Sequence, residues 1–249
     1  MKKILASVAL MALVSACASP YRPTPFDHAT SGISSIQVVE DAFPEQPAVR
    51  KLATNGQNIA SSTGGLGLAG LVVGVAAASI EAGIAANQNK KINTALATQK
   101  FDGEAIFDEA FEAELKNQSY DVSAAKIKRE QNRAMIVATK QGDAKEGTAV
   151  LDVNGHGYGY QQVGGTKMWR PYVVITVKMY DAKDPTKVLL DNHVEYNAVV
   201  PGELTVNIPA DEAYGFESVE AIEADPVKAA EGLRKALVAS AYATAQLLK

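Results

Sequence analysis

Apolar and polar residues alternate in three stretches of the second half of the chain, and this pattern constrains the fold more than any other feature of the sequence. The apolar positions are Ala149, Leu151 and Val153, then Val173, Ile175, Val177 and Met179, and finally Val188, Leu190 and Val194. Successive side chains of a strand point to opposite faces, so each stretch predicts a strand with one apolar and one mixed face. Asp184-Pro185 lies between the last two stretches, where a hairpin needs its turn. We therefore expect an antiparallel sheet that is covered on one face.

Two other segments have the spacing of amphipathic helices. Residues 101–120 gather their apolar side chains on one helical face, at Ile106, Phe107, Ala110, Phe111 and Leu115. Asp225-Pro226 supplies an N-cap and a first-turn proline for a helix that continues toward the last residue. Short strands are expected within residues 34–42 and 120–123. The predicted fold class is α+β, with helices packed on one face of the antiparallel β-sheet.

The N-terminus has the organisation of a bacterial export signal. Lys2 and Lys3 precede an apolar run, residues 4–14, that is too short to span a bilayer. Small residues and a cysteine follow, in Val14-Ser15-Ala16-Cys17. This ending resembles the lipobox of bacterial lipoproteins, which implies cleavage before Cys17 and attachment of diacylglycerol and an acyl chain such as palmitate to it. The alternative is a plain secretory signal with a chance cysteine.

The residues around Cys17 bear on stability and on location. Cys17 is the only cysteine in the chain, so no internal disulfide is possible and a hydrophobic core must stabilise the fold. Ala18 and Ser19 follow it, without the aspartate that tends to retain enteric lipoproteins in the inner membrane. That resemblance favours the outer membrane, with the domain facing the periplasm or the cell surface.

The stretch from Leu52 to Ile80 has no charged residue and is rich in glycine and alanine. Small residues recur every four positions at Gly70, Gly74, Ala78, Ala82 and Ala86, and on a helix they form a stripe that lets another helix approach closely. The segment resembles the glycine zippers of bacterial outer-membrane lipoproteins, which implies helix packing and self-association. A packed soluble helix and a flexible linker are the alternatives, because the apolar part would be about 22 Å long against a hydrocarbon core of roughly 30 Å.

These features divide the chain into five parts. Residues 1–16 are the predicted signal peptide and residues 17–33 a proline-rich, lipid-anchored tether. Residues 34–55 hold the first strand and residues 56–98 the glycine-zipper segment. Residues 99–249 form the main α+β domain.

The sequence holds no recognisable motif for catalysis or nucleotide binding. Asp152, His156, His193 and Glu195 are of metal-ligand type and lie on predicted strands, but their spacing is not that of a metal site. We therefore predict no enzyme activity, no metal, no cofactor and no catalytic residue.

Four aromatic residues are candidates for partner binding. Tyr158, Tyr160, Trp169 and Tyr172 surround a glycine-rich stretch, and such amphipathic rings suit recognition of a protein, peptide or glycan surface. The alternative is that they pack across neighbouring strands.

Charge and layout narrow the function. Without Lys2 and Lys3 the chain has 22 basic and 28 acidic residues, a net charge of −6, which argues against nucleic acid as a partner. The order of elements is similar to small periplasmic modules, such as the N-terminal domain of the Tol translocation protein, the lipoprotein activators of penicillin-binding proteins and the periplasmic part of the curli secretion lipoprotein. We expect a structural, assembly or oligomerisation role at the outer membrane. The alternative is a periplasmic accessory lipoprotein that binds and regulates an envelope enzyme or transporter.

Overall fold

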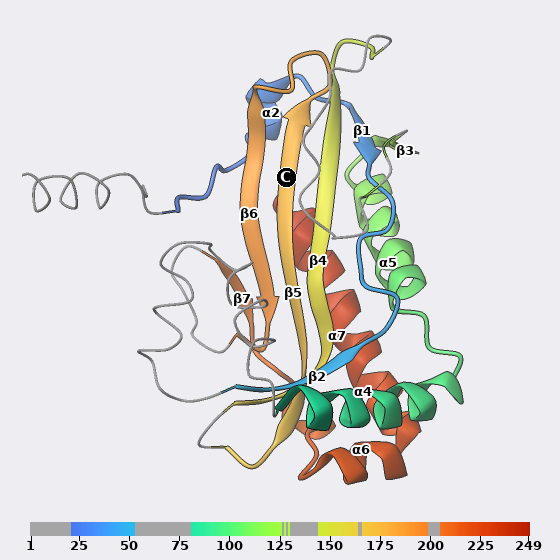
Figure 1. The fold of residues 1–249 in the computed structure, drawn as a ribbon. Helices are drawn as coiled ribbons and strands as arrows, with labels where there is room; N and C mark the ends of the chain where they lie inside the picture. The colour runs from blue at the N-terminus through green and yellow to red at the C-terminus, as the bar shows by residue number, and fades with distance from the viewer. Residues whose placement is uncertain are drawn as a thin grey trace, which may run out of the picture.

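Three long adjacent strands form the centre of the structure, a computed structural model that describes residues 21–52, 81–125, 127, 129, 144–163, 166–198 and 205–249 (Figure 1). The strands are β4 (Thr148–Val163), β5 (Trp169–Asp181) and β6 (Val188–Tyr196). Both β4–β5 and β5–β6 are antiparallel pairs. The turn between β5 and β6 contains Asp184, whose Oδ1 accepts a hydrogen bond from the Thr186 N–H at 3.1 Å. The three alternating stretches are thus confirmed as antiparallel neighbours.

Four short strands extend this centre and make the sheet mixed. They are β1 (Ser35–Val38), β2 (Ala48–Leu52), β3 (Asp121–Ala124) and β7 (Val206–Ile208). The strand order is β3-β1-β4-β5-β6-β7, with β2 also paired to β4, and β1–β3, β1–β4, β2–β4 and β6–β7 are all parallel. The α+β class is confirmed, but the expectation of a purely antiparallel sheet is wrong. Helices lie between β1 and β3 in the sequence, and such crossovers return the chain in the same direction.

Strands β1 and β2 pair with the same edge of β4 and are separated by a short connection. Ser35 lies opposite Thr148, whereas Ala48 lies opposite Gly159. Between these two pairings the register of β4 with β5 shifts at Gly155 and Gly157, which is a β-bulge.

The glycines of the Gly155–Tyr160 motif make room for this connection. Gly159 has a φ of +144°, and a Cβ there would overlap the carbonyl oxygen of Ala48. A Cβ at Gly155 would overlap the ring of Phe43. The motif is therefore part of a strand against which another segment of the chain packs closely.

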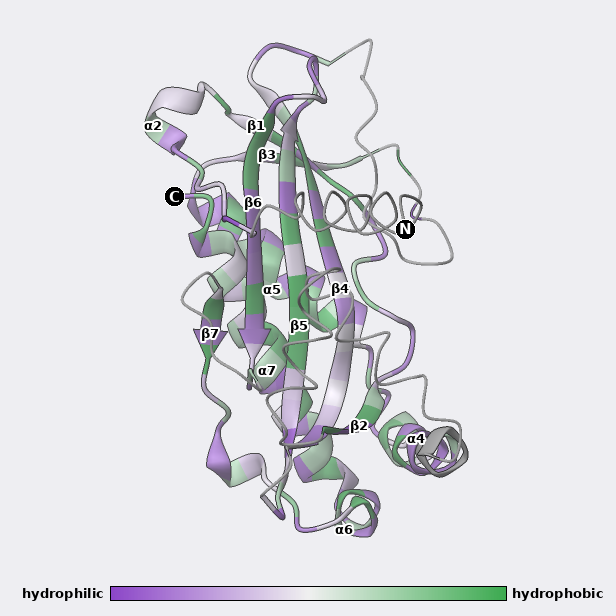
Figure 2. Cartoon of the chain, turned by 60° about the vertical axis from the view of Figure 1, so that its left-hand side comes forward, coloured by the Kyte–Doolittle hydropathy of each residue, from purple (hydrophilic) through white to green (hydrophobic). Residues whose placement is uncertain are grey.

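Two long helices cover one face of the sheet (Figures 1 and 2). They are α5 (Gly103–Asn117) and α7 (Pro226–Gln246), and they begin at the N-caps Asp102 and Asp225. The main core joins them to the inner face of the strands, and it includes Phe107, Phe111, Leu115, Leu151, Val153, Ile175, Val177, Leu190, Leu237 and Ala241. The predicted apolar face of residues 101–120 is confirmed, with Ala110 packed at its margin.

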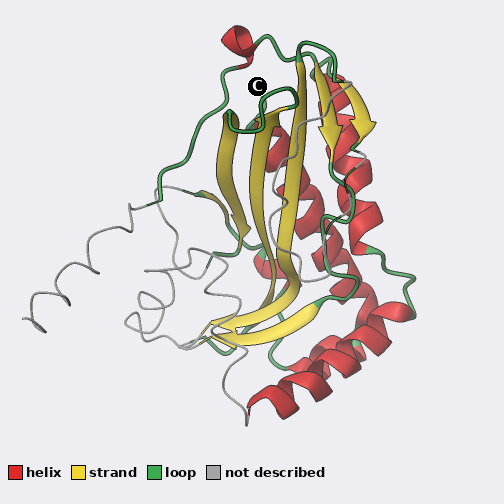
Figure 3. Ribbon diagram, turned by 45° about the horizontal axis from the view of Figure 1, so that its top comes forward, coloured by secondary structure: helices red, strands yellow, loops and turns green. Residues whose placement is uncertain are grey.

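A second core lies at the far end of the sheet, where α4 (Glu81–Ala97) and α6 (Val219–Ala224) pack (Figure 3). Ile92 and Leu96 of α4 are buried there with Tyr160 and Ile222. In addition, the N–H of Val49 in β2 donates to Asn89 Oδ1 at 2.6 Å. The described end of segment 56–98 is therefore built into the domain. Among the described helices, none is long and apolar enough to cross a bilayer.

The start of the described chain docks on β6. Thr24 and Asp191 exchange two backbone hydrogen bonds, of 2.8 and 3.0 Å, as an antiparallel bridge. The ring of Tyr21 lies 4.4 Å from that of His193. A short helix, α2 (His28–Ser31), then leads to β1. The predicted tether is thus held against the sheet from Tyr21 onward.

Candidate functional site

The four aromatic residues proposed for partner binding are buried. Tyr158 is 1% exposed and stands edge-on to Phe43, with ring centroids 5.6 Å apart. Tyr160 is fully buried, and its hydroxyl donates to the carbonyl oxygen of Ala229 at 3.1 Å. Trp169 and Tyr172 are 6% and 3% exposed. All four pack within the domain, which is the alternative interpretation, and they offer no exposed recognition surface.

The structure does not assemble the four residues of metal-ligand type, Asp152, His156, His193 and Glu195, into a metal site. His156 Nε2 and His193 Nδ1 both contact Thr176 Oγ1, at 2.7 and 3.0 Å. Burial lowers the pKa of His193 to about 4, so this side chain is neutral at pH 7. Asp152 instead pairs with Arg129 at 2.6 Å. Within the described residues, no three His, Cys, Asp or Glu side chains come together as metal ligands do.

The remaining predicted site residues fall at or beyond the edge of what the structure describes. Cys17, Gly70, Gly74 and Ala78 lie outside the described residues. Ala82 lies in the first turn of α4. The lipid attachment and the glycine-zipper packing therefore stay predictions.

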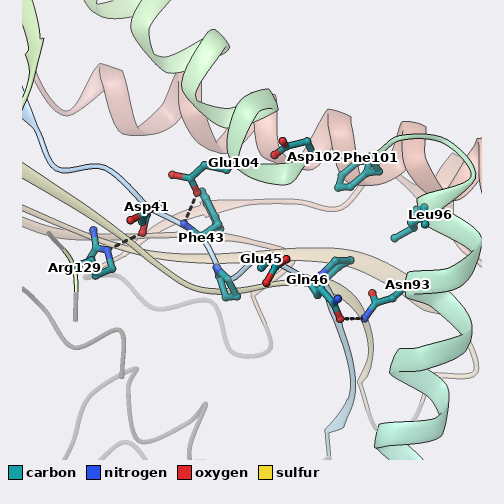
Figure 4. Close-up of a pocket in the computed structure, with 13 residues that line it drawn as sticks. Asp41, Phe43, Glu45, Gln46, Asn93, Leu96, Phe101, Asp102, Glu104 and Arg129 are labelled. Atoms are coloured by element: carbon teal, nitrogen blue, oxygen red, sulfur yellow. Dashed lines mark hydrogen bonds between the residues drawn. The ribbon is translucent and has the colours of Figure 1, made fainter. Parts of the chain in front are cut away.

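An open groove of about 800 Å³ lies beside the connection between β1 and β2 (Figure 4). Its walls are formed by the connection and by residues 93–104, which run from the end of α4 into α5, with Arg129 at one end. The lining residues are Asp41 and Phe43 to Pro47 from the connection, Asn93, Leu96 and Ala97 from α4, and Phe101, Asp102 and Glu104 from the start of α5.

Hydrogen bonds to backbone groups hold the connection in place. The Glu104 carboxylate accepts from the N–H groups of Ala42 and Phe43, at 2.5 and 2.6 Å. Arg129 Nε donates to the carbonyl oxygen of Asp41 at 2.7 Å. Asp41 has a φ of +60°, the left-handed region that aspartate tolerates better than most residues. Glu104 and Arg129 thus fix a segment that is not paired as a strand.

Carboxylates predominate among the charged residues of the groove. Among the described lining residues, Asp41, Glu45, Asp102 and Glu104 are acidic and Arg129 is basic. The effect extends to Asp108, one turn beyond Glu104 on α5. Burial, and then the negative charges of Glu104, Glu112, Asp102 and Asp41, raise the pKa of Asp108 to about 7. This end of α5 therefore carries a concentrated negative potential.

Sequence reasoning missed this groove. Pro44 and Pro47 follow the short strand expected within residues 34–42, and Asp102 and Glu104 begin the predicted amphipathic helix. The two prolines and the apolar residues near 43 and 101 were visible in the sequence, but nothing there shows that they meet.

Comparisons with known proteins found no matching family, no matching curated protein and no matching solved structure.

Proposed function

We propose that this chain is a lipid-anchored protein of the bacterial cell envelope, held at the outer membrane through Cys17, whose domain binds another envelope component and has no catalytic activity of its own. The Val14–Cys17 lipobox supports the anchor. The observation that supports binding is the open groove, because a preformed concave site of about 800 Å³ is of the size that proteins use for ligands.

The packing of α4 favours the accessory module over a purely membrane-embedded assembly element. Ile92 and Leu96 are buried in the second core, and Lys91 Nζ lies 3.4 Å from Glu220 Oε1 of α6. A helix fixed in this way holds one wall of the groove. Self-association through Gly70 and Gly74 remains the second candidate, and it depends on residues outside the described part.

The anchor is tested by metabolic labelling. Cells that express the chain are fed a labelled palmitate analogue, and the Cys17→Ser variant is the matched control. We expect the native chain to incorporate the label and to be found in the membrane fraction, and we expect neither result for the variant. A native chain that carries no label and associates with membranes no more than the Cys17→Ser variant does would contradict the anchor.

The binding role is tested by photo-crosslinking in living cells. A photoreactive amino acid replaces Gln46, which is exposed in the groove, or Val238, which is 43% exposed on α7 outside it. We expect a discrete heavier adduct from position 46 and none from position 238. No adduct from position 46, or the same adduct from both positions, would contradict a binding role for the groove.

A further inference from the structure

The described residues that line the groove carry more negative than positive charge. Arg129 is the one cation among these described lining residues, and its guanidinium is already paired with Asp152 at 2.6 Å, with both side chains 1% exposed. Glu45 and Asp102, by contrast, are exposed carboxylates. Because a buried and paired cation offsets little of their field, a ligand of complementary charge is cationic.

Apolar groups line the groove between these charges. Pro44 and Phe101 are partly exposed in its walls, whereas Leu96 and Phe43, at 2% and 3% exposed, form the packed layer beneath them. Phe43 is held in place by Phe107, with ring centroids 5.0 Å apart. A fully hydrated metal ion would make no use of such a surface, whereas aliphatic side chains or lysine stems would bury against it.

Two buried polar atoms at opposite ends of the groove have no hydrogen-bond partner among the described residues. They are Arg129 Nη1 and Asn93 Oδ1 (Figure 4). Arg129 donates from Nε to Asp41 and from Nη2 to Asp152 and Val153. Its Nη1 donates to no described residue. Since buried polar groups in folded proteins are nearly always satisfied, each atom needs an explanation.

A peptide main chain supplies both missing partners, a carbonyl for Arg129 Nη1 and an N–H for Asn93 Oδ1. Because the charge of Arg129 is compensated by Asp152, a neutral carbonyl suits Nη1 as well as an anion does. Both atoms are covered by protein, so a ligand would reach them through rotamer changes, which are common at interfaces.

We propose that the groove binds an extended peptide segment of a partner protein in which lysine or arginine alternates with apolar residues. This inference rests on the proposed function, since it names the partner chemistry of the same groove. Main-chain hydrogen bonds would position the segment, the cationic side chains would meet Glu45 and Asp102, and the apolar ones would cover the partly exposed Pro44 and Phe101.

The test measures binding of a fluorescent nonapeptide of alternating lysine and valine to the full-length chain in mild detergent at 150 mM salt. We expect saturable binding with a Kd in the micromolar range. A peptide with glutamate in place of lysine should not bind, and one with serine in place of valine should bind at least fivefold more weakly.

Matched variants locate the site. Glu45→Gln/Asp102→Asn keeps the N-cap and should weaken binding on the order of fivefold, as expected for the loss of two exposed ion pairs. Glu217→Gln/Glu231→Gln removes the same net charge from exposed positions outside the groove and should change the Kd less than twofold. Ala97→Trp, at an exposed groove position, should abolish binding, whereas Val238→Trp should not.

Several outcomes would overturn the proposal. Equal loss in both double variants would mean attraction by net charge alone, and binding that survives Ala97→Trp would place the peptide elsewhere. Displacement by 1 mM calcium at constant ionic strength would make the groove a cation site. If the peptide fails to bind while position 46 still crosslinks in cells, the peptide chemistry is wrong and the binding role stands. If both fail, both are wrong.

Discussion

At the scale of single residues, Gly159 should be the least replaceable glycine of its motif. Its positive φ is costly for any other residue, and a Cβ would overlap the Ala48 carbonyl oxygen of β2. We expect Gly159→Ala to lower the free energy of unfolding by about 3 kcal/mol or more, through strain and loss of the β2 pairing. Gly157→Ala is the control, because a Cβ there makes ordinary contacts with the Tyr172 side chain alone, at 3.5 Å from Oη and 3.8 Å from Cε2. Urea unfolding of both variants measures the difference, and equal losses would contradict this role of Gly159.

Asp108 should make the domain less stable as the pH rises. Its pKa is raised from 3.8 to about 7 in the folded chain, so the folded state binds more protons than the unfolded state between these values. The associated stability is complete below pH 4 and is lost as the pH approaches and passes 7. At pH 8, Asp108→Asn should therefore stabilise the domain by about 1 kcal/mol, a value reduced by solvent screening, and at pH 4 it should change little.

Thermal unfolding at pH 4 and pH 8 compares Asp108→Asn with Glu109→Gln, which removes a neighbouring exposed charge from the same helix. A gain that is the same at both pH values would show that the pKa of Asp108 is not its cause.

The aromatic residues show why the sequence could not reveal which side chains are exposed. Leu151 and Val153 alternate correctly onto the core face of β4. The bulge between Gly155 and Gly157 then adds one residue, so that Tyr158 and Tyr160 also point into the cores. Uninterrupted alternation would have placed both tyrosines with Asp152 on the other face. One extra residue reverses the face of the sheet to which every later side chain of the strand points, and no local sequence pattern indicates the bulge.

At the scale of elements, the sequence predicted the long segments and the short strands β1 and β3, but it predicted neither β2 and β7 nor the parallel pairing. The helix α5 and the strands β4 to β6 have enough residues for their apolar spacing to be read. Strands β1, β2, β3 and β7 have only three to five residues each. Their parallel pairing depends on partners that are distant in sequence, and alternation within one segment does not show which partner it meets.

The attachment of α4 to β2 gives a prediction at the same scale. Asn89→Ala would leave the buried N–H of Val49 without its 2.6 Å acceptor, which should lower the free energy of unfolding by about 1–3 kcal/mol. Lys90→Ala, at an exposed neighbouring position, should change it by less than 0.5 kcal/mol, roughly the range of ordinary surface substitutions. Protection of the Val49 amide in hydrogen exchange should fall only in Asn89→Ala. Equal protection in both variants would mean that α4 does not hold β2.

At the scale of the whole molecule, the groove is a product of tertiary structure. Its walls come from residues near 45 and from residues 93–104, and Arg129 contributes from a third segment. Each contribution is ordinary in sequence: a proline pair, a helix end, an N-cap and an arginine in a charged stretch. Only the packing of α4 and α5 around the β1–β2 connection brings them together, so the sequence predicted the scaffold and not the site.

Docking of the N-terminal segment on β6 can be trapped covalently. Thr24 and Asp191 exchange both backbone hydrogen bonds, and such pairs have Cα atoms about 5.5 Å apart, within reach of a disulfide. In a Cys17→Ser background, Thr24→Cys/Asp191→Cys should oxidise readily and raise the free energy of unfolding by about 2–4 kcal/mol over the reduced form. Thr24→Cys/Asp184→Cys is the control and should stay reduced. Thiol titration and urea unfolding report both, and a reduced Thr24→Cys/Asp191→Cys protein would show that the segment is undocked.

The pairing of β1 and β2 with β4 also sets an order of events in time. Ser35 and Ala48 pair with Thr148 and Gly159, which lie more than a hundred residues later in the chain and are therefore synthesised later. During synthesis from the N-terminus, β1 and β2 are exposed before β4, the strand with which both pair, has been made. Long-range pairings of this kind form slowly. Newly made chains are thus most vulnerable to proteases and to aggregation during this interval. A pause in translation between residues 52 and 148 would lengthen this vulnerable interval, whereas the same pause after residue 163 would not.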